Sequence, residues 1–334
     1  MRCASAQGLD GSGTPMVADR VLQVPADERT GLMPVVTALA ASHDGKLLAS
    51  GGDDHIVRIW DRETGKITKN LRGHTDWVRT AEFHPDNKRL ITAADDHTIR
   101  LWNLDNDEST VLFETTGPSY CLCFRADGKE LAHAGFANTV SVLDVEKREV
   151  IQQLEAPSND VRAMLFAPQA AMLAAAGRNG KIRVWQGNEL KFVRDIDAHR
   201  QRVRTMAFSP DGAYLASGGE DRQLVIWNVA SGTEAFRLPL RPGRIHCVAY
   251  CGASLLAVGT SDNVIRIWDL QQRVEVMRML GHTGSIAALI YVADASELIS
   301  AGFDTSIRIW KLTPEAGARV AQQPVTEDSS RIVR

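Results

Sequence analysis

The chain has 334 residues, of which 44% are hydrophobic and 24% charged, and its net charge is −3. These values are typical of a globular protein, and the slight excess of acid gives no general attraction to nucleic acids or membranes. No apolar stretch is long enough to span a bilayer, and the N-terminus lacks the apolar segment of a secretory signal. The five cysteines lack the spacing of a metal site, so we expect reduced core thiols in a cytoplasmic protein.

The predicted elements begin after a segment rich in Gly, Ser and Ala, residues 1–19, which is expected to be flexible. The sequence RVLQVP at 20–25 then predicts an isolated strand. From Val35 onward one order of elements recurs: an apolar strand, a turn, a second strand that ends in small residues, a strand that ends in tryptophan, and a more polar fourth strand. Residues 316–334 are expected to form a flexible tail.

The tryptophan that ends the third strand recurs at almost constant spacing. Successive positions are 41 or 42 residues apart, and a leucine takes the place of the tryptophan in one repeat. The seven positions are Trp60, Trp102, Leu143, Trp185, Trp227, Trp268 and Trp310. A period of this length with four strands in each repeat predicts an all-β, seven-bladed β-propeller with four antiparallel strands per blade, over residues 20–315.

Closure of such a ring needs an outer strand for the seventh blade. The strand at 20–25 is the favoured donor, because it stands alone before the first repeat, and the sequence GARVAQQ at 317–323 is the rival. A closed ring buries the apolar faces of all blades against one another and leaves no free end. We therefore expect the two ends of the chain to share the seventh blade.

Three repeats place a histidine, a hydroxyl residue and an aspartate 28, 10 and 6 residues before the tryptophan. A buried indole N–H needs an acceptor, which the hydroxyl supplies, and the hydroxyl can donate to the histidine, which donates to the aspartate. A hydrolytic Ser-His-Asp triad would instead need an exposed hydroxyl beside an oxyanion site. The three sets are His74, Thr92, Asp96 and Trp102; His199, Ser217, Asp221 and Trp227; and His282, Ser300, Asp304 and Trp310.

This pattern resembles the WD-repeat family, the G-protein-β-like seven-bladed β-propellers, over nearly all of residues 20–314. The other four repeats depart from it: Leu32 stands at the histidine position of the first, Val258 at the hydroxyl position of the sixth, Ala175 and Asn179 in the fourth, and His133, Ala137 and Leu143 in the third. Apolar replacement of both partners of a hydrogen bond can be neutral, so these blades are still expected to fold. An arginine two residues before the tryptophan is expected to be structural, as in Arg58, Arg100, Arg183, Arg266 and Arg308.

The resemblance implies a contact surface at the narrower opening of the ring, with three positions per blade. One lies just before the inner strand, one two residues later, and one before the position of the buried aspartate. Arginines and aromatic residues, which dominate interaction hot spots, gather at these positions. The candidate residues are Trp77, Arg79, Tyr120, Arg162, Arg178, Arg202, Arg204, Arg244 and His246. Four acids share the same face and could pair with the arginines: Asp53, Asp95, Asp160 and Glu220.

The sequence therefore predicts a non-catalytic scaffold that binds a protein or peptide partner, with an acidic or phosphorylated partner as the expected class. One alternative is a propeller enzyme with a cofactor in the central channel, but no metal, haem or nucleotide motif supports it, so no cofactor and no catalytic residue are expected. The other is nucleic-acid binding through the arginines, which the acidic composition disfavours. Neither a membrane contact nor a catalytic activity is expected.

Overall fold

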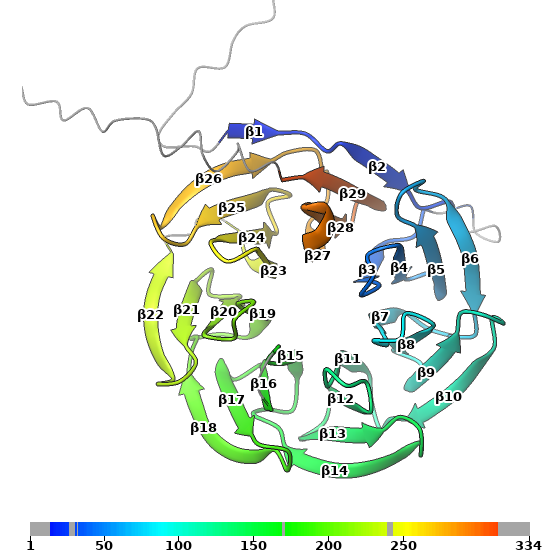
Figure 1. Ribbon diagram of the computed structural model, residues 1–334, viewed down its shortest axis with the longest axis horizontal. Helices are drawn as coiled ribbons and strands as arrows, with labels where there is room; N and C mark the ends of the chain where they lie inside the picture. The colour runs from blue at the N-terminus through cyan, green and yellow to red at the C-terminus, as the bar shows by residue number, and fades with distance from the viewer. Residues whose placement is uncertain (1–13, 27–30, 32, 169–170, 239–242, 313–334) are drawn as a thin grey trace, which may run out of the picture.

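The computed structural model describes residues 14–26, 31, 33–168, 171–238 and 243–312, which form seven four-stranded antiparallel blades around one axis (Figure 1). The predicted all-β, seven-bladed propeller is confirmed. Each blade meets the axis with its first strand and the rim with its fourth. The chain passes from blade to blade through the loop that joins a fourth strand to the next first strand.

The first strands are β3 (Val36–Ala41), β7 (Val78–Phe83), β11 (Ser119–Phe124), β15 (Val161–Phe166), β19 (Val203–Phe208), β23 (Ile245–Cys251) and β27 (Ile286–Val292). The second strands are β4 (Leu47–Gly52), β8 (Arg89–Ala94), β12 (Glu130–Gly135), β16 (Met172–Gly177), β20 (Tyr214–Gly219), β24 (Leu255–Thr260) and β28 (Glu297–Gly302). A 3-10 turn, η1 (Ala293–Ala295), joins β27 to β28.

The third strands are β5 (Ile56–Asp61), β9 (Thr98–Asn103), β13 (Thr139–Asp144), β17 (Lys181–Gln186), β21 (Leu224–Asn228), β25 (Ile265–Asp269) and β29 (Ser306–Lys311). The fourth strands are β6 (Ile67–Arg72), β10 (Ser109–Glu114), β14 (Glu149–Glu155), β18 (Lys191–Asp197), β22 (Thr233–Leu238), β26 (Val274–Met279) and, in the seventh blade, β2 (Arg20–Gln23).

Small residues at the ends of the second strands allow neighbouring blades to pack closely. The last five residues of β4 and of β20 are buried, because each blade is covered by another blade on both faces. A Cβ atom on Gly51 would lie 2.7 Å from Cγ1 of Val78 in the next blade, and one on Gly218 would lie 2.5 Å from Cγ2 of Ile245. Glycine is therefore required at these positions by the contact between blades.

The N-terminal strand closes the ring, as the sequence predicted. Strand β2 pairs antiparallel with β29, so that Arg20 lies opposite Ile309 and Gln23 opposite Ser306. Leu22 is buried in the same apolar cluster as Trp60, which joins the seventh blade to the first. The rival segment at 317–323 lies outside the described residues.

One prediction for the N-terminal segment was wrong. Residues 14–16, expected to be flexible, form strand β1 (Thr14–Met16), which pairs in parallel with the rim strand β26. The sixth blade thus carries a fifth strand, which covers the edge that its fourth strand would otherwise expose (Figure 1). Residues 1–13 and 313–334 lie outside the described part of the chain.

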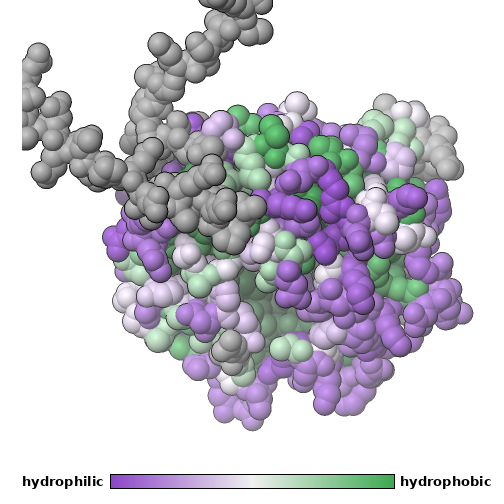
Figure 2. All heavy atoms as spheres, turned by 45° about the horizontal axis from the view of Figure 1, so that its top comes forward, coloured by the Kyte–Doolittle hydropathy of each residue, from purple (hydrophilic) through white to green (hydrophobic). Residues whose placement is uncertain are grey.

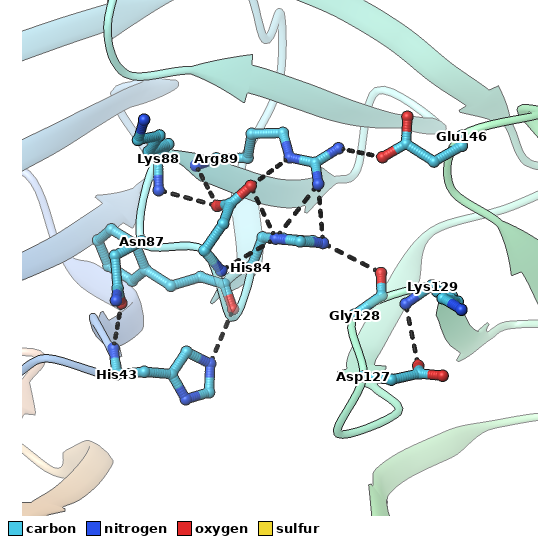
Figure 3. A network of polar contacts seen from close by, with 11 residues as sticks. His43, His84, Asn87, Lys88, Arg89, Asp127, Gly128, Lys129 and Glu146 are labelled. Carbon is cyan, nitrogen blue, oxygen red and sulfur yellow. Dashed lines mark hydrogen bonds and ion pairs between the residues drawn. The ribbon is translucent and has the colours of Figure 1, made fainter.

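Polar side chains in the turns between first and second strands join adjacent blades (Figure 3). The backbone N–H of His43 in blade one donates to Asn87 Oδ1 in blade two at 2.7 Å. Nε2 of His84 lies 3.1 Å from the carbonyl oxygen of Gly128 in blade three. Arg89 then contacts the His84 ring and pairs with Glu146 at 2.6 Å. These contacts fasten the first three blades together at the end of the ring that carries these turns.

The three predicted buried sets form as expected. In blade five, Trp227 Nε1 donates to Ser217 Oγ at 2.8 Å, Ser217 lies 2.8 Å from Nε2 of His199, and Nδ1 of His199 lies 3.0 Å from Asp221. Burial alone would raise the pKa of Asp221, but the hydrogen bonds and charge of His199 and the backbone N–H groups of Arg200 and Gln223 outweigh it and lower that pKa. The corresponding sets in blades two and seven have the same geometry.

Blades one and six lack the histidine but keep the aspartate, and they use the recurrent arginine instead. In blade one, Arg58 is buried and lies 2.5 Å from Asp54, while Trp60 still donates to Ser50. In blade six, Arg266 lies 2.6 Å from Asp262. In blade seven the histidine holds the aspartate, and Arg308 lies 4.0 Å from it. In blades one and six the arginine is therefore structural, as predicted, because it compensates the aspartate where no imidazole reaches it.

The cysteines of the described residues are free thiols in the core, as the sequence predicted. Cys121, Cys123, Cys247 and Cys251 are all buried and unpaired. Burial raises the pKa of the Cys121 and Cys251 thiols to about 12. They are therefore protonated and unreactive at neutral pH. Cys3 lies outside the described residues.

We predict that Asp221→Ala lowers the free energy of unfolding by about 1–3 kcal/mol, because His199 Nδ1 and the Arg200 N–H lose their acceptor. Thermal unfolding followed by circular dichroism should show a midpoint several degrees below that of the wild type. Asp197→Ala is the matched control, since the Asp197 side chain is 86% exposed. Equal midpoints for the two variants would contradict the role of the buried set.

A second prediction concerns His133, which stands at the hydroxyl position of blade three. Burial lowers its pKa to about 4, so the folded protein keeps this imidazole neutral while the unfolded chain protonates it below pH of about 6.5. The contribution of neutral His133 to the free energy of unfolding is therefore fully present above pH 6.5 and is lost as the pH falls from there toward 4. The free energy of unfolding, measured in urea, should fall between pH 7.5 and 4.5 by roughly 2–3 kcal/mol more in the wild type than in His133→Gln. Parallel losses in the two proteins would contradict this prediction.

Candidate protein-interaction face

The top face of the ring is defined here by the loops that enter the first strands and the turns between second and third strands. In blades two to seven a residue of that turn donates its backbone N–H to the carbonyl of the entering loop. The pairs are Asp95 to Trp77, Phe136 to Pro118, Arg178 to Asp160, Glu220 to Arg202, Ser261 to Arg244 and Phe303 to Ser285, at 2.9–3.0 Å. Two of the three predicted contact positions thus lie side by side in each of these blades.

The remaining contact position, two residues after the one before the inner strand, coincides with a β-bulge near the start of each first strand. The register with the second strand shifts between Val78 and Thr80, between Val161 and Ala163, and at the matching place in the other five blades. A bulge leaves one residue unpaired and can turn its side chain away from the sheet. The unpaired residues are Thr37, Arg79, Tyr120, Arg162, Arg204, His246 and Ala287. All nine candidate residues therefore occupy the three positions at this end of the ring.

Aromatic rings and guanidinium groups alternate across blades two to four. The Arg79 guanidinium carbon lies 4.5 Å from the Trp77 ring centre and 5.8 Å from that of Tyr120. Arg162 lies 3.6 Å from the Tyr120 ring, on the side of the next blade. Phe136 meets Tyr120 edge to face, with ring centres 5.8 Å apart. Each such cation–π contact contributes about 0.5–2 kcal/mol and holds the arginine side chain in place.

Acidic side chains pair with four of the six arginines at the contact positions. Asp160, whose side chain is fully buried, lies 2.6 Å from Arg162 and 2.7 Å from Arg202. Glu220 pairs with Arg202 at 3.2 Å and with Arg204 at 2.8 Å. Asp95 pairs with Arg79 at 2.9 Å. The acids identified in the sequence therefore neutralise most of this face, so it is less positive than the arginine count alone suggested.

Two of the six arginines at the contact positions have no acidic partner among the described residues. Arg178 and Arg244 are exposed, and within the described residues no acid lies in ion-pair range of either side chain. Asp53, the fourth acid, instead accepts a hydrogen bond from the backbone N–H of Val35 at 2.8 Å. Burial, with Arg204 and Arg244 nearby, lowers the pKa of His246, so this imidazole is neutral at pH 7. Among the arginines at the contact positions, uncompensated charge therefore lies in blades four and six.

Sequence reasoning located the residues of this face but missed two features that organise it. The bulges were missed because a bulge leaves no residue-type signal in strands as varied as VRTAEF and SYCLCF. The double role of Asp160 was missed because its partners come from two different blades. Across the residues that the structure describes, no three His, Cys, Asp or Glu side chains gather as a metal site would require. No helix formed by these residues is long and apolar enough to cross a membrane.

Comparison with known proteins assigns the family. Six segments match the family described as "WD domain, G-beta repeat" (WD40), and together they cover more than half of the chain: residues 31–61, 65–103, 148–186, 190–228, 240–269 and 273–311. The chain belongs to the WD40 repeat family. The matched segments leave out residues 104–147, which contain the third WD40 repeat with His133, Ala137 and Leu143.

Two relatives share parts of this WD40 chain. A stretch of 41 residues is 51% identical to Nuclear distribution protein PAC1 of Coprinopsis cinerea and covers 12% of this chain and 9% of that protein. A stretch of 141 residues is 27% identical to WD repeat-containing protein SL1-17 of Schistosoma mansoni and covers 42% of this chain and 46% of that protein. The chain thus matches less than half the length of either relative.

We predict that Asp160→Asn destabilises the propeller more than Asp95→Asn does. Removal of the buried Asp160 charge leaves Arg162 and Arg202 without a shared counter-ion, whereas Asp95 pairs with one arginine and is partly exposed. Because both arginines keep some solvent contact, the expected difference in the free energy of unfolding is about 1–3 kcal/mol. Chemical denaturation of both variants measures it, and equal losses would show that Asp160 does not anchor the face.

Proposed function

We propose that this WD40 propeller is a scaffold that binds a protein partner through its top face, and that the partner segment carries acidic or phosphorylated side chains. WD40 repeat proteins are typically non-catalytic and generally bind proteins. The observation that carries the finer proposal is the pair of exposed, uncompensated arginines, Arg178 and Arg244, beside the rigid array of stacked and paired arginines. Guanidinium groups bind carboxylates and phosphates through two parallel hydrogen bonds.

The arrangement favours a protein over a nucleic acid. A phosphate backbone is bound by many unpaired cations, and its affinity depends on how many charges it neutralises. Four of the six arginines at the contact positions already have acidic partners, so these positions offer few charges to a long polyanion. Aromatic side chains with a small number of free arginines are typical of protein interaction hot spots. We further propose that the protein acts in the cytoplasm, where its buried thiols stay reduced.

Binding to an array of short peptides tests this proposal, with each position substituted in turn by Glu, phosphoserine, Ser and Lys. We expect enrichment of Glu and phosphoserine, and a loss of at least about tenfold in affinity for the double variant Arg178→Glu/Arg244→Glu, since each charge-assisted contact contributes roughly 1.5–3 kcal/mol. Arg162 and Arg202 are unsuitable targets, because reversing their charge would place new acids beside buried Asp160.

The matched control is Arg72→Glu/Arg148→Glu, which reverses two exposed arginines on the rim of the ring and should leave binding unchanged. An array without preference for acidic residues would refute the acidic partner. Equal loss in the two double variants would refute the top face as the binding surface. A generic oligonucleotide that binds with a steep dependence on salt would favour the nucleic-acid alternative instead.

A further inference from the structure

A pocket lies between blades five and six at the bottom face of the ring, which is formed by the turns between first and second strands and between third and fourth strands. Its volume is about 320 Å³, which is within the range of ligand sites. Hydrophobic side chains on the face shown in Figure 2 lie in small groups among hydrophilic ones, whereas Ile226, Phe236, Tyr250 and Leu270 line this one pocket. The pocket is therefore a candidate site for an apolar group.

The pocket lies beside a turn that is one residue shorter in blade six than in the other blades. In blade five, Phe208 pairs with Leu215, seven positions later, and the same separation holds in blades one to four and seven. In blade six, Tyr250 pairs with Leu256, six positions later. The short turn carries the exposed Ala253, which lines the pocket. It therefore reaches less far over blade five and leaves the pocket open.

Aromatic rings form much of the pocket wall. Tyr214 is 40% exposed and stands at the mouth, whereas Tyr250 is 8% exposed and forms part of the inner wall. The Tyr250 hydroxyl is buried, so this residue offers an occupant its ring and not its oxygen. The guanidinium carbon of Arg273 lies 4.6 Å from the ring centre of Phe236 and brings a positive charge to the blade-six side. A flat apolar group can therefore pack against these rings.

Asp211 provides a hydrogen-bond acceptor in the pocket lining. Its Oδ1 accepts from Ser209 Oγ at 2.6 Å and from the Ala213 N–H at 3.0 Å, while Oδ2 accepts no hydrogen bond from another described residue. The hydrogen bonds from Ser209 and Ala213 lower the pKa of Asp211, so this exposed side chain is a carboxylate at neutral pH. Within the described residues no cation lies in ion-pair range of it. The carboxylate therefore favours an occupant that donates a hydrogen bond beside its apolar part.

We propose that this pocket binds the indole ring of a tryptophan side chain from a partner protein, with the indole N–H donating to Asp211. An indole combines a flat apolar ring with one N–H donor at its edge. A cavity of roughly 150 Å³ holds benzene, so 320 Å³ accommodates the larger bicyclic ring. An ammonium group fits less well, because Arg273 already brings a positive charge, and Asp211 repels a carboxylate. A purely aliphatic group would desolvate Asp211 without offering a donor.

The tryptophans of the chain itself are already engaged. Six of the seven are at most 5% exposed inside the blades, and Trp77 stacks with Arg79 on the top face. The exposed Tyr214 and Asp211 at the mouth leave room for the polypeptide that carries the inserted ring. The bottom and top faces are opposite ends of the ring. The site therefore does not rest on the function proposed above, and the propeller can hold two partners at once.

Nuclear magnetic resonance of the full chain with 13C-labelled isoleucine methyl groups tests the site. Ile226 lines the pocket, and its signal is identified by its loss in Ile226→Val. We expect N-acetyltryptophanamide to shift this signal saturably through the ring current of the bound indole. The benzothiophene analogue, in which sulfur replaces the indole N–H, should bind at least about fivefold more weakly, because it cannot donate to Asp211.

An Asp211→Asn variant tests the hydrogen bond itself. The amide keeps one oxygen for the bonds inside the turn but presents an NH2 group in place of the free carboxylate oxygen, so the two ligands should bind this variant equally. Asp44→Asn is the matched control, because Asp44 accepts from Ser42 Oγ and the Lys46 N–H in the corresponding turn of blade one. It should leave both affinities unchanged.

The outcomes separate this site from the top face. Ala253→Phe fills the pocket from an exposed position and should abolish the Ile226 shift, whereas Arg178→Glu/Arg244→Glu should keep it in full. No saturable shift with N-acetyltryptophanamide, or equal binding of the benzothiophene analogue to the wild type, overturns the proposal. Tighter binding of free indole would assign a small molecule, and an oligomer that Trp77→Ala dissociates would assign a second copy; either result overturns the partner protein.

Discussion

The indole N–H of the recurring tryptophan is a buried donor that needs an acceptor in the six blades that carry it. Where a hydroxyl lies ten residues earlier it accepts this hydrogen, as Ser217 does from Trp227. In blade six Val258 replaces the hydroxyl, and within the described residues Trp268 Nε1 has no partner. That blade nevertheless keeps the same strand order and pairing. The polar set therefore adds stability and rigidity to sheets whose formation depends on the burial of their apolar faces.

The buried sets also fix the top face, because the internal aspartate and the outward residue are neighbours in the same turn. Asp96 accepts from the backbone N–H groups of Thr75 and Thr98 at 3.0 and 2.9 Å, which ties the turn to the entering loop and to β9. The residue before it, Asp95, faces outward and holds Arg79. Rigidity inside the blade is thereby transmitted to the surface, and a surface that is already ordered loses less entropy when it binds a partner.

Most of the fold could be predicted from the sequence, because a pattern that is weak in one repeat becomes clear when it recurs in seven. The period and the buried sets follow from residue types at fixed distances, and the closing strand follows from its isolated position before the first repeat. Strand β1 could not be predicted, since three residues of ordinary composition pair only because β26 offers them a free edge. The charge of the face could not be predicted either: the acids were visible, but the sharing of Asp160 between Arg162 and Arg202 depends on the approach of two blades.

Departures from the repeat make the top face of the ring asymmetric, because different blades carry different kinds of side chain. Aromatic side chains gather where blades two and three meet, around Trp77 and Tyr120, whereas the unpaired arginines of the contact positions, Arg178 and Arg244, lie on blades four and six. A partner that crossed the ring in the reverse sense would place its acids over the rings and its apolar groups over the guanidinium groups. Such a mismatch leaves charges desolvated without a counter-ion, which costs more than a lost apolar contact. The blade that lacks the buried set lies on the aromatic side, so the loss of the internal set and the aromatic cluster of the surface coincide in blade three.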